Sequence, residues 1–389
     1  MPDQQPTAGV SLTRDAWRRL KRNRVAMIAL GVLVTVVLLA IFTPLLPLQP
    51  PDRHNTAIQF ARPTASPLWL ETFDLDPAEL AASAERLPAA RRELADARLN
   101  ESGEIVRQKK DALSSITQRP YRRVGFTTLG PVSRWMVRTR LALFGKWELN
   151  SLCGRDELGR DVLSRVFWGA RISLVVGLVA TLVSLVIGVT WGATAGYVGG
   201  WVDDAMMRTV DVLYSIPFIF VVIFLLTILS EDSIKDWLEG WGIDRITIFY
   251  FVVGAIYWLT MARVVRGQVI SLKNEPFIEA ARSLGVTQAG IIFRHLVPNL
   301  FSVVIVYLTL TIPRVILFEA FLSFLGLGVE PPDVSWGLLA NEGIRVITPV
   351  RTYWWLILYP SLGIGATLFA LNFLGDGLRD AFDPRLRNR

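Results

Sequence analysis

The sequence predicts an all-α integral membrane protein with six membrane-spanning helices and a large, partly helical external insert after the first span. Of the 389 residues, 52% are hydrophobic and only 19% are charged, whereas soluble globular proteins contain about 25% charged residues. The apolar residues are gathered in runs that match the about 17–25 residues of a membrane-crossing helix. Because a membrane-spanning barrel has short alternating stretches instead, these runs favour helices.

Six apolar runs define the predicted spans, at residues 25–46, 172–197, 212–229, 246–265, 300–322 and 354–373. The first run follows a basic segment, residues 1–24, and is long enough to be a retained helix and not a cleaved signal. Lys and Arg accumulate in cytoplasmic loops. We therefore predict cytoplasmic termini, a cytoplasmic loop over residues 273–299 and a cytoplasmic tail over residues 377–389, while the acidic loop at 230–245 faces outward.

The predicted external insert occupies residues 47–152, and the other five spans form a core over residues 153–376. In the insert, Asp76, Pro77 and Glu79 match an N-cap, a first-turn proline and a capping-box glutamate. A helix with an apolar stripe is expected to begin there.

Proline is expected to bend or divide that helix at Pro88. A second helix is predicted over residues 104–117, whereas residues 126–150 give no assignable pattern. Pro217 and Pro313 are predicted to kink their spans.

Small and aromatic residues mark the spans in two further ways. Four glycines have a spacing that lets helix backbones approach closely: Gly177, Gly188, Gly192 and Gly196. Six tryptophans near predicted span ends are expected to be interfacial anchors: Trp191, Trp201, Trp258, Trp336, Trp354 and Trp355.

The loop between the fourth and fifth predicted spans is too polar to lie in lipid. Pro276 suits the first position of a helix, and Gly285 suits the left-handed residue that follows its end. Thr287 then offers an N-cap for a second helix, with Val286 and Ile291 at the positions of a hydrophobic staple. The loop is predicted to form a rigid elbow of two short helices.

A family resemblance rests on the same loop. Glu279, Ala280 and Ala281 form an EAA triplet, Gly285 follows the glutamate by six positions, and Pro298 stands thirteen positions further on. This pattern resembles the EAA loop of ATP-binding-cassette (ABC) importer permeases, whose coupling helix docks in a groove of the ATPase subunit. The resemblance implies that these five residues couple the chain to an ATPase.

Other motifs extend the resemblance over roughly residues 150–387. Its structural motif residues are Asp156, Gly159, Arg160, Asp161, Gly326, Gly328, Trp336 and Asp376. Together they are similar to the C-type subunit of the dipeptide, oligopeptide and nickel importers, which implies a type I six-helix permease fold. Arg155 departs from the family's usual threonine, and the insert is longer than the family's usual outer loop.

The resemblance also implies partners and a location. The expected partners are a homologous B-type permease subunit, two ABC ATPase subunits, an external solute-binding protein and membrane lipid, in the bacterial inner membrane. No G-x-x-x-x-G-K-[ST] motif occurs in the sequence. We therefore expect a permease without catalytic residues or a cofactor of its own, with ATP and Mg²⁺ used by the partner ATPases.

Peptides or peptide-like solutes are the expected cargo, with nickel and oligosaccharides as alternatives. A channel or receptor whose inner loop binds an unrelated protein is an alternative from another class. An embedded enzyme is disfavoured because the spans lack paired carboxylates, an HExxH motif and a Ser/His pair.

Nucleic-acid binding and metal binding are also disfavoured. The net charge is +7, but the arginines flank apolar runs instead of forming a soluble basic face. Cys153 is the only cysteine, and His54 and His295 stand apart from each other, so no cluster of metal ligands is expected.

Overall fold

The computed structural model describes residues 12–64, 69–71, 73, 75–100, 103–229, 231, 234 and 245–382. The helices outside the insert are α1 (Leu12–Arg22), α2 (Arg24–Phe42), α6 (Val162–Val198), α7 (Gly200–Ser215), α8 (Phe218–Leu229), α10 (Arg245–Leu272), α11 (Pro276–Ser283), α12 (Gln288–Gly290), α13 (Val297–Asn299), α14 (Phe301–Phe324), α15 (Trp336–Arg345) and α16 (Trp355–Phe382). Short 3₁₀ turns follow α2 at Thr43–Leu45 and lie at Thr56–Ile58, and a π-helical turn, Ile291–Leu296, joins α12 to α13.

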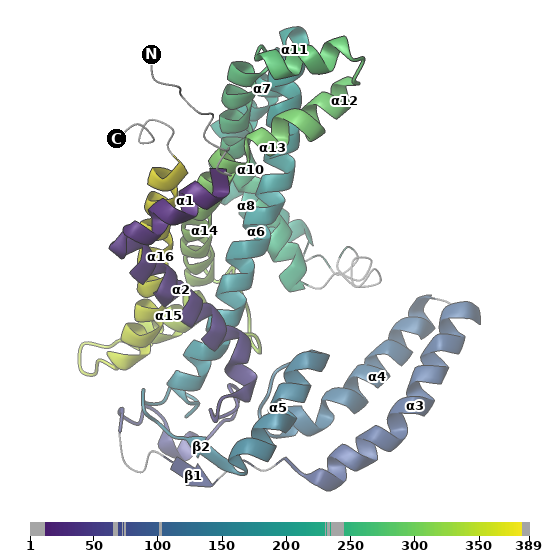
Figure 1. The fold of residues 1–389 in the computed structure, drawn as a ribbon. Helices are drawn as coiled ribbons and strands as arrows, with labels where there is room; N and C mark the ends of the chain where they lie inside the picture. The colour runs from purple at the N-terminus through teal and green to yellow at the C-terminus, as the bar shows by residue number, and fades with distance from the viewer. Residues whose placement is uncertain are drawn as a thin grey trace.

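The long helices run between two ends of the molecule (Figure 1). Helix α1, the C-terminal end of α16 and the helices α11 to α13 lie toward one end, whereas α15 and the insert lie toward the other. We call these the elbow end and the insert end. The loop at 273–299 therefore lies on the opposite side of the spans from the insert, as the sequence predicts.

Five helices of the described residues are long and apolar enough to cross a membrane. They are Arg24–Leu45, Val162–Val198, Thr247–Leu272, Phe301–Phe324 and Trp355–Phe382. The prediction of a continuous third span over residues 212–229 is wrong, because that region consists of α7 and α8, which meet at an angle of 87°.

The break between α7 and α8 has a local cause at Pro217. The ring of a proline disfavours helical backbone in the residue before it, and proline has no N–H for the helix ladder. Ile216 accordingly has extended backbone, with φ −85° and ψ 127°. The expected kink is thus a full break, and the two helices count as a sixth span only if the bent pair is one crossing. In contrast, α14 continues through Pro313.

Glycines on α6 explain its close packing against α10, the most extensive helix pairing among the described residues. A Cβ atom added at Gly192 would lie 2.3 Å from the carbonyl oxygen of Ala262, and one at Gly188 would lie 2.6 Å from Cβ of Met261. A Cβ atom at Gly196 would lie 2.9 Å from the carbonyl oxygen of Arg266. The predicted close approach of helix backbones is confirmed, and larger residues here would push α6 and α10 apart.

Three of the expected interfacial tryptophans lie inside the protein. Trp258, Trp336 and Trp355 are each less than 10% exposed. The indole N–H of Trp336 donates to the carbonyl oxygen of Val166 at 2.9 Å, and the indole N–H of Trp355 donates to the carbonyl oxygen of Arg155 at 3.2 Å. The prediction of an anchoring role is therefore wrong for these three tryptophans, because each ring is buried within the protein instead of lying at a membrane–water interface.

The insert contains α3 (Pro77–Asn100), α4 (Gly103–Arg123), α5 (Pro131–Phe144) and an antiparallel pair of strands, β1 (Trp69–Glu71) and β2 (Trp147–Leu149). Helices α3 and α4 form a hairpin that projects from the insert end (Figure 1). The backbone N–H of Ala78 donates to Asp76 Oδ1 at 2.9 Å, which confirms the N-cap. Glu79 pairs with Arg123 of α4.

The helices of the insert differ from the expectations in two ways. Helix α3 was expected to bend or divide at Pro88, and it continues through this residue undivided. Helix α4 extends to Arg123 instead of ending near residue 117. Helix α5 lies in the segment 126–150, for which no element was predicted. A common core explains these elements: Phe73, Tyr121, Phe126, Val137 and Trp168 are all buried together. Tertiary packing of this kind stabilises helices whose own periodicity is weak.

Candidate functional site

The loop at the elbow end contains the predicted pair of short helices. Helix α11 begins with Pro276 at its first turn, and Gly285 after its end has φ +75°. The N–H of Gly285 donates to the carbonyl oxygen of Arg282 at 2.9 Å, and that of Val286 donates to Ala281 at 3.1 Å. These two bonds form a Schellman motif, which satisfies carbonyl groups at the end of the helix.

The second helical segment of the elbow begins at Thr287. Its hydroxyl oxygen accepts the N–H of Gly290 at 3.2 Å, as the sequence predicts for an N-cap. The segment then continues through the π-helical turn into α13, which contains Pro298. Proline has no N–H for the carbonyl four residues earlier, and the wider π-helical turn lies directly before it. Such turns occur frequently at functional sites.

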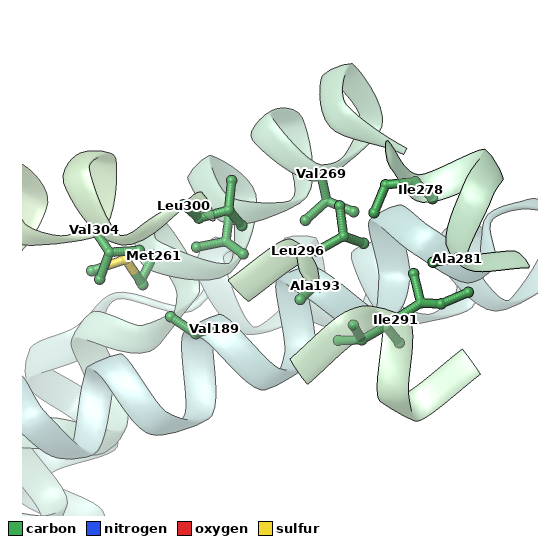
Figure 2. Close-up of a cluster of buried hydrophobic side chains, with 12 residues drawn as sticks. Val189, Ala193, Met261, Val269, Ile278, Ala281, Ile291, Leu296, Leu300 and Val304 are labelled. Carbon is green, nitrogen blue, oxygen red and sulfur yellow. The ribbon is translucent and has the colours of Figure 1, made fainter. Parts of the chain in front are cut away.

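A buried apolar cluster fixes the elbow to the spans. Ile278 and Ala281 of α11 belong to a cluster with residues of the π-helical turn Ile291–Leu296, α14, α6 and α10 (Figure 2). Ile278 is 0% exposed and Ala281 is 5% exposed. The other members of this cluster are Val189, Ala193, Met261, Val265, Val269, Ile291, Ile292, Leu296, Leu300 and Val304. The elbow is therefore a packed extension of α6 and α10, and not a free loop.

Polar contacts tie the elbow to the C-terminal end of α6. The guanidinium of Arg282 lies over the ring of Tyr197, 5.2 Å from its centre, and its Nε atom donates to the Tyr197 hydroxyl at 3.3 Å. The ammonium group of Lys273 donates to the carbonyl oxygen of Gly196 at 3.3 Å. Together with the apolar packing, these contacts orient the elbow relative to α6.

The outer side of α11 is exposed and partly apolar. Phe277, Ala280 and Leu284 are spaced three and four residues apart, which places them on one helix face. Leu284 is 83% exposed and Phe277 is 40% exposed. Glu279 is also exposed, in the first turn of the helix, where the helix dipole favours an anion. We call Phe277, Glu279, Ala280 and Leu284 the outer face of the elbow.

The residues that the family resemblance links to an ATPase differ in their solvent exposure. Glu279, Ala280 and Gly285 are exposed, as is Pro298, whereas Ala281 is buried. Phe277 and Leu284 were not identified as candidate residues from the sequence. Large apolar residues within a polar loop were the signal that could have revealed them.

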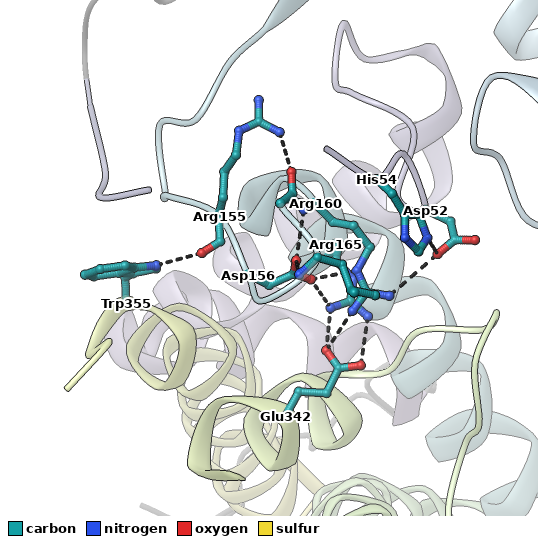
Figure 3. Close-up of polar contacts among 10 residues, drawn as sticks. Asp52, His54, Arg155, Asp156, Arg160, Arg165, Glu342 and Trp355 are labelled. Atoms are coloured by element: carbon teal, nitrogen blue, oxygen red, sulfur yellow. Dashed lines mark hydrogen bonds and ion pairs between the residues drawn. The ribbon is translucent and has the colours of Figure 1, made fainter. Parts of the chain in front are cut away.

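The second group of predicted residues forms a buried ionic network at the insert end (Figure 3). The carboxylate of Asp156 accepts from Arg160 Nε at 2.7 Å and from one terminal nitrogen of Arg165 at 2.8 Å. Arg165 also pairs with Glu342 of α15. Asp52, which follows the first span, lies 3.6 Å from Arg160. This network connects three segments that are distant in the sequence.

Asp161 and Gly159 complete the turn that leads into α6. The carboxylate of Asp161 accepts the N–H of Ser164 at 2.8 Å and that of Ser151 at 3.0 Å, so it caps the helix. Burial raises the pKa of Asp161 to about 6. Gly159 has φ +71°, and a Cβ atom there would lie 1.8 Å from the carbonyl oxygen of Asn55. Only glycine fits at this position.

The remaining motif residues have separate structural settings. Gly326 has φ +76° after the end of α14, and a Cβ atom at Gly328 would lie 2.0 Å from the hydroxyl oxygen of Ser323. Trp336 begins α15, and its backbone N–H donates to the hydroxyl of Ser173 on α6 at 3.1 Å. Asp376 is exposed on α16 and does not join the ionic network.

Comparisons with known proteins decide the family. Residues 188–388 match the family described as binding-protein-dependent transport system inner membrane component. The chain belongs to this family. Residues 11–63 match the N-terminal transmembrane domain of oligopeptide transport permease C. Residues 64–187, which contain the insert helices, lie outside both matches.

Several permeases from bacteria are similar to this chain. It is 49% identical over 236 residues to the oligopeptide transport system permease protein OppC of Escherichia coli (strain K12), covering 60% of this chain and 72% of that protein. It is 45% identical over 236 residues to OppC of Haemophilus influenzae, covering 60% and 70%. It is 40% identical over 234 residues to the dipeptide transport system permease protein DppC of Bacillus subtilis (strain 168), covering 60% and 68%.

Proposed function

We propose that this chain is the permease subunit of an ATP-driven importer for peptides or peptide-like solutes. Membership of the family supports the transport role, and the names of the similar permeases favour peptides over nickel or oligosaccharides. The chain would form the translocation pathway together with a homologous B-type permease. A solute-binding protein would deliver the cargo from outside.

The observation that carries this proposal is the construction of the elbow. Its inner residues Ile278 and Ala281 are buried against α6 and α10, while Leu284 on its outer face is 83% exposed. Phe277 on the same face is also exposed, and a group of exposed apolar side chains on a rigid support is typical of an interaction site. We propose that an ATPase subunit covers this outer face.

Coupling would follow from the rigidity of these contacts. Closure of two ATPases around ATP would move α11, and the buried cluster would transmit this movement to α6 and α10 as a rigid body. The ionic network of Asp156, Arg165 and Glu342 would hold the insert end of α6 to α15 during the movement. Mg²⁺ and ATP would be bound by the partner subunits, because this sequence has no P-loop motif.

We further propose that the elbow end is cytoplasmic and the insert end external, in the bacterial inner membrane. The basic residues at the elbow end, among them Arg263, Lys273 and Arg282, support this orientation. The insert, with its hairpin of α3 and α4, would then lie on the external side, where it would meet the solute-binding protein.

Reconstitution tests the proposed function. The chain is co-expressed with its permease partner, ATPases and binding protein, and uptake of a radiolabelled peptide into proteoliposomes is measured. We expect accumulation that requires ATP, the ATPases and the binding protein. Equal peptide flux without ATP would instead indicate the channel alternative and contradict the proposal.

A further inference from the structure

A cavity of about 420 Å³ lies where the insert meets the spans at the insert end. Its lining combines hydroxyl, aromatic, charged and aliphatic side chains: Thr128 before α5, Ser133 of α5, Trp168, Arg171, Ile172 and Val175 of α6, and Asp333 before α15. A concave surface with a few polar groups among aromatic side chains is typical of sites for small ligands.

The main charged group of this cavity is Arg171. One terminal nitrogen of its guanidinium donates to the hydroxyl oxygen of Ser133 at 2.9 Å, and the guanidinium lies 4.9 Å from the ring centre of Trp168. Ser133 and Trp168 are themselves buried. Within the part of the chain that the structure describes, Arg171 makes these two side-chain contacts, and neither partner carries a negative charge.

An arginine that is half-buried without an anionic partner favours an anion from elsewhere. Its planar guanidinium can bind a carboxylate through two parallel hydrogen bonds, and the Ser133 contact uses only one of its terminal nitrogens. The ring of Trp168 holds the guanidinium plane in place. The N-terminus of α5 has no side-chain cap and opens onto the same cavity at Gly130, which adds partial positive charge.

The position of Arg171 along α6 places the cavity at the entrance to the spans. Helix α6 has 37 residues, which gives it a length of about 55 Å, whereas the hydrocarbon core is about 30 Å thick. No charged residue follows Arg171 within this helix, since residues 172–198 are all uncharged. Arg171 thus marks the boundary at which the apolar run begins.

We propose that this cavity binds the terminal carboxylate of a peptide as the peptide enters the pathway, with Arg171 as the carboxylate ligand and Ser133 and Trp168 as its positioning residues. This inference rests on the proposed function and deepens it. The apolar side chains of Ile172 and Val175 line the way toward the spans.

The first test compares two labelled peptides of one sequence, with a free carboxylate or an amide at the C-terminus. Uptake efficiency is measured with the full transporter carrying wild-type chain, Arg171→Gln or Arg171→Lys. Loss of a charge-assisted bond predicts that Arg171→Gln lowers the efficiency for the free-carboxylate peptide by about tenfold or more. The amidated peptide changes by less than about twofold, and Arg171→Lys lies between.

The matched control is Arg134→Gln, since Arg134 lies on α5 one residue after Ser133 but lines a different cavity. This variant should leave the ratio of the uptake efficiencies of the two peptides unchanged. The same binding protein serves all variants, so its own preference cancels in the comparison. If the Arg171→Gln transporter keeps the wild-type ratio of uptake efficiencies for the two peptides, the carboxylate-binding inference is wrong and the proposed function is unaffected. A wild-type transporter that moves neither peptide refutes the proposed function and, with it, this inference.

The second test detects occupancy without the binding protein. Thr128 is an exposed residue of the cavity lining, and Thr128→Cys gives a site for a thiol reagent in the assembled transporter. The free-carboxylate peptide should slow this labelling at least about fivefold, the amidated peptide should not, and Arg171→Gln should abolish the protection. Protection that depends on anionic lipid in the proteoliposome and not on the peptide assigns the site to a lipid headgroup and overturns the inference.

Discussion

Ala280 and Ala281 are adjacent in the sequence, yet they have opposite environments: Ala281 is buried against the ends of the spans, whereas Ala280 is exposed on the outer face of the elbow. A small residue on the inner side lets α11 pack closely on the spans. A small residue on the outer side allows an equally close approach by a partner. The helix would therefore contact protein on both sides if an ATPase covers its outer face as proposed.

Replacing the glycine that ends α11 is expected to misdirect the elbow. Gly285 has φ +75°, and a Cβ atom there would meet nothing within 4 Å, so the cost of Gly285→Val lies in the backbone. That cost is about 1–2 kcal/mol. We expect normal membrane insertion with at least about a fivefold loss of ATPase co-purification or peptide uptake. Gly267→Val is the control, because Gly267 is helical and its surroundings are also open. Wild-type coupling in Gly285→Val would contradict this assignment.

Removing Arg165 is expected to destabilise the insert end. Its side chain is buried between Asp156 and Glu342, and removal of one partner from a buried ion pair costs about 3–5 kcal/mol. Arg165→Ala should lower the midpoint of thermal unfolding of the purified chain well below that of Arg345→Ala, which alters an exposed residue of α15, the helix that carries Glu342. Equal midpoints for the two variants would show that the network has no stabilising role.

Asp161 should give the chain a measurable pH dependence. Burial raises the pKa of its carboxyl from 3.8 to about 6. Between these values the folded chain binds more protons than the unfolded chain, so the contribution of Asp161 to stability falls as the pH rises from about 4 to about 6. The stability advantage of the wild type over Asp161→Asn should therefore shrink over that interval, as measured by thermal unfolding. An advantage that grows with pH would be the opposite of this expectation.

Local signals allowed much of the elbow to be predicted. Pro276, Gly285 and Thr287 act on the backbone within a few residues of themselves, and each has the predicted role. The long apolar runs likewise identified most spans. The break before α8 was harder to predict, since a proline either bends or breaks a helix depending on what its neighbours supply.

The ionic network could not be derived from sequence patterns. Arg165 and Glu342 are 177 positions apart, and nothing in the local sequence of either residue specifies the other. The same limit applies to Arg140 and Glu148 in the insert, a buried pair whose charged atoms approach to 3.7 Å. Burial lowers the pKa of Arg140 to about 10. Such pairs depend on tertiary packing, which periodicity does not encode.

Cys153, the only cysteine in the sequence, should not compete with a cysteine that is introduced at the elbow for chemical cross-linking. Cys153 is buried, and burial raises the pKa of its thiol to about 12. Because the thiolate is the reactive form, this residue should react very slowly near neutral pH. A cysteine introduced at an exposed position can therefore be modified selectively in the otherwise natural chain.

The most direct test of the central claim is cross-linking from Leu284 to the ATPase. Leu284→Cys, labelled with a photoreactive maleimide in the assembled transporter, should yield a covalent adduct with the ATPase subunit on illumination. Val350→Cys is the control, because Val350 is 89% exposed but lies between α15 and α16 at the insert end. The account predicts an ATPase adduct for Leu284→Cys and none for Val350→Cys. Absence of the adduct at Leu284→Cys, in a preparation where the ATPase is bound and the label is attached, would contradict it.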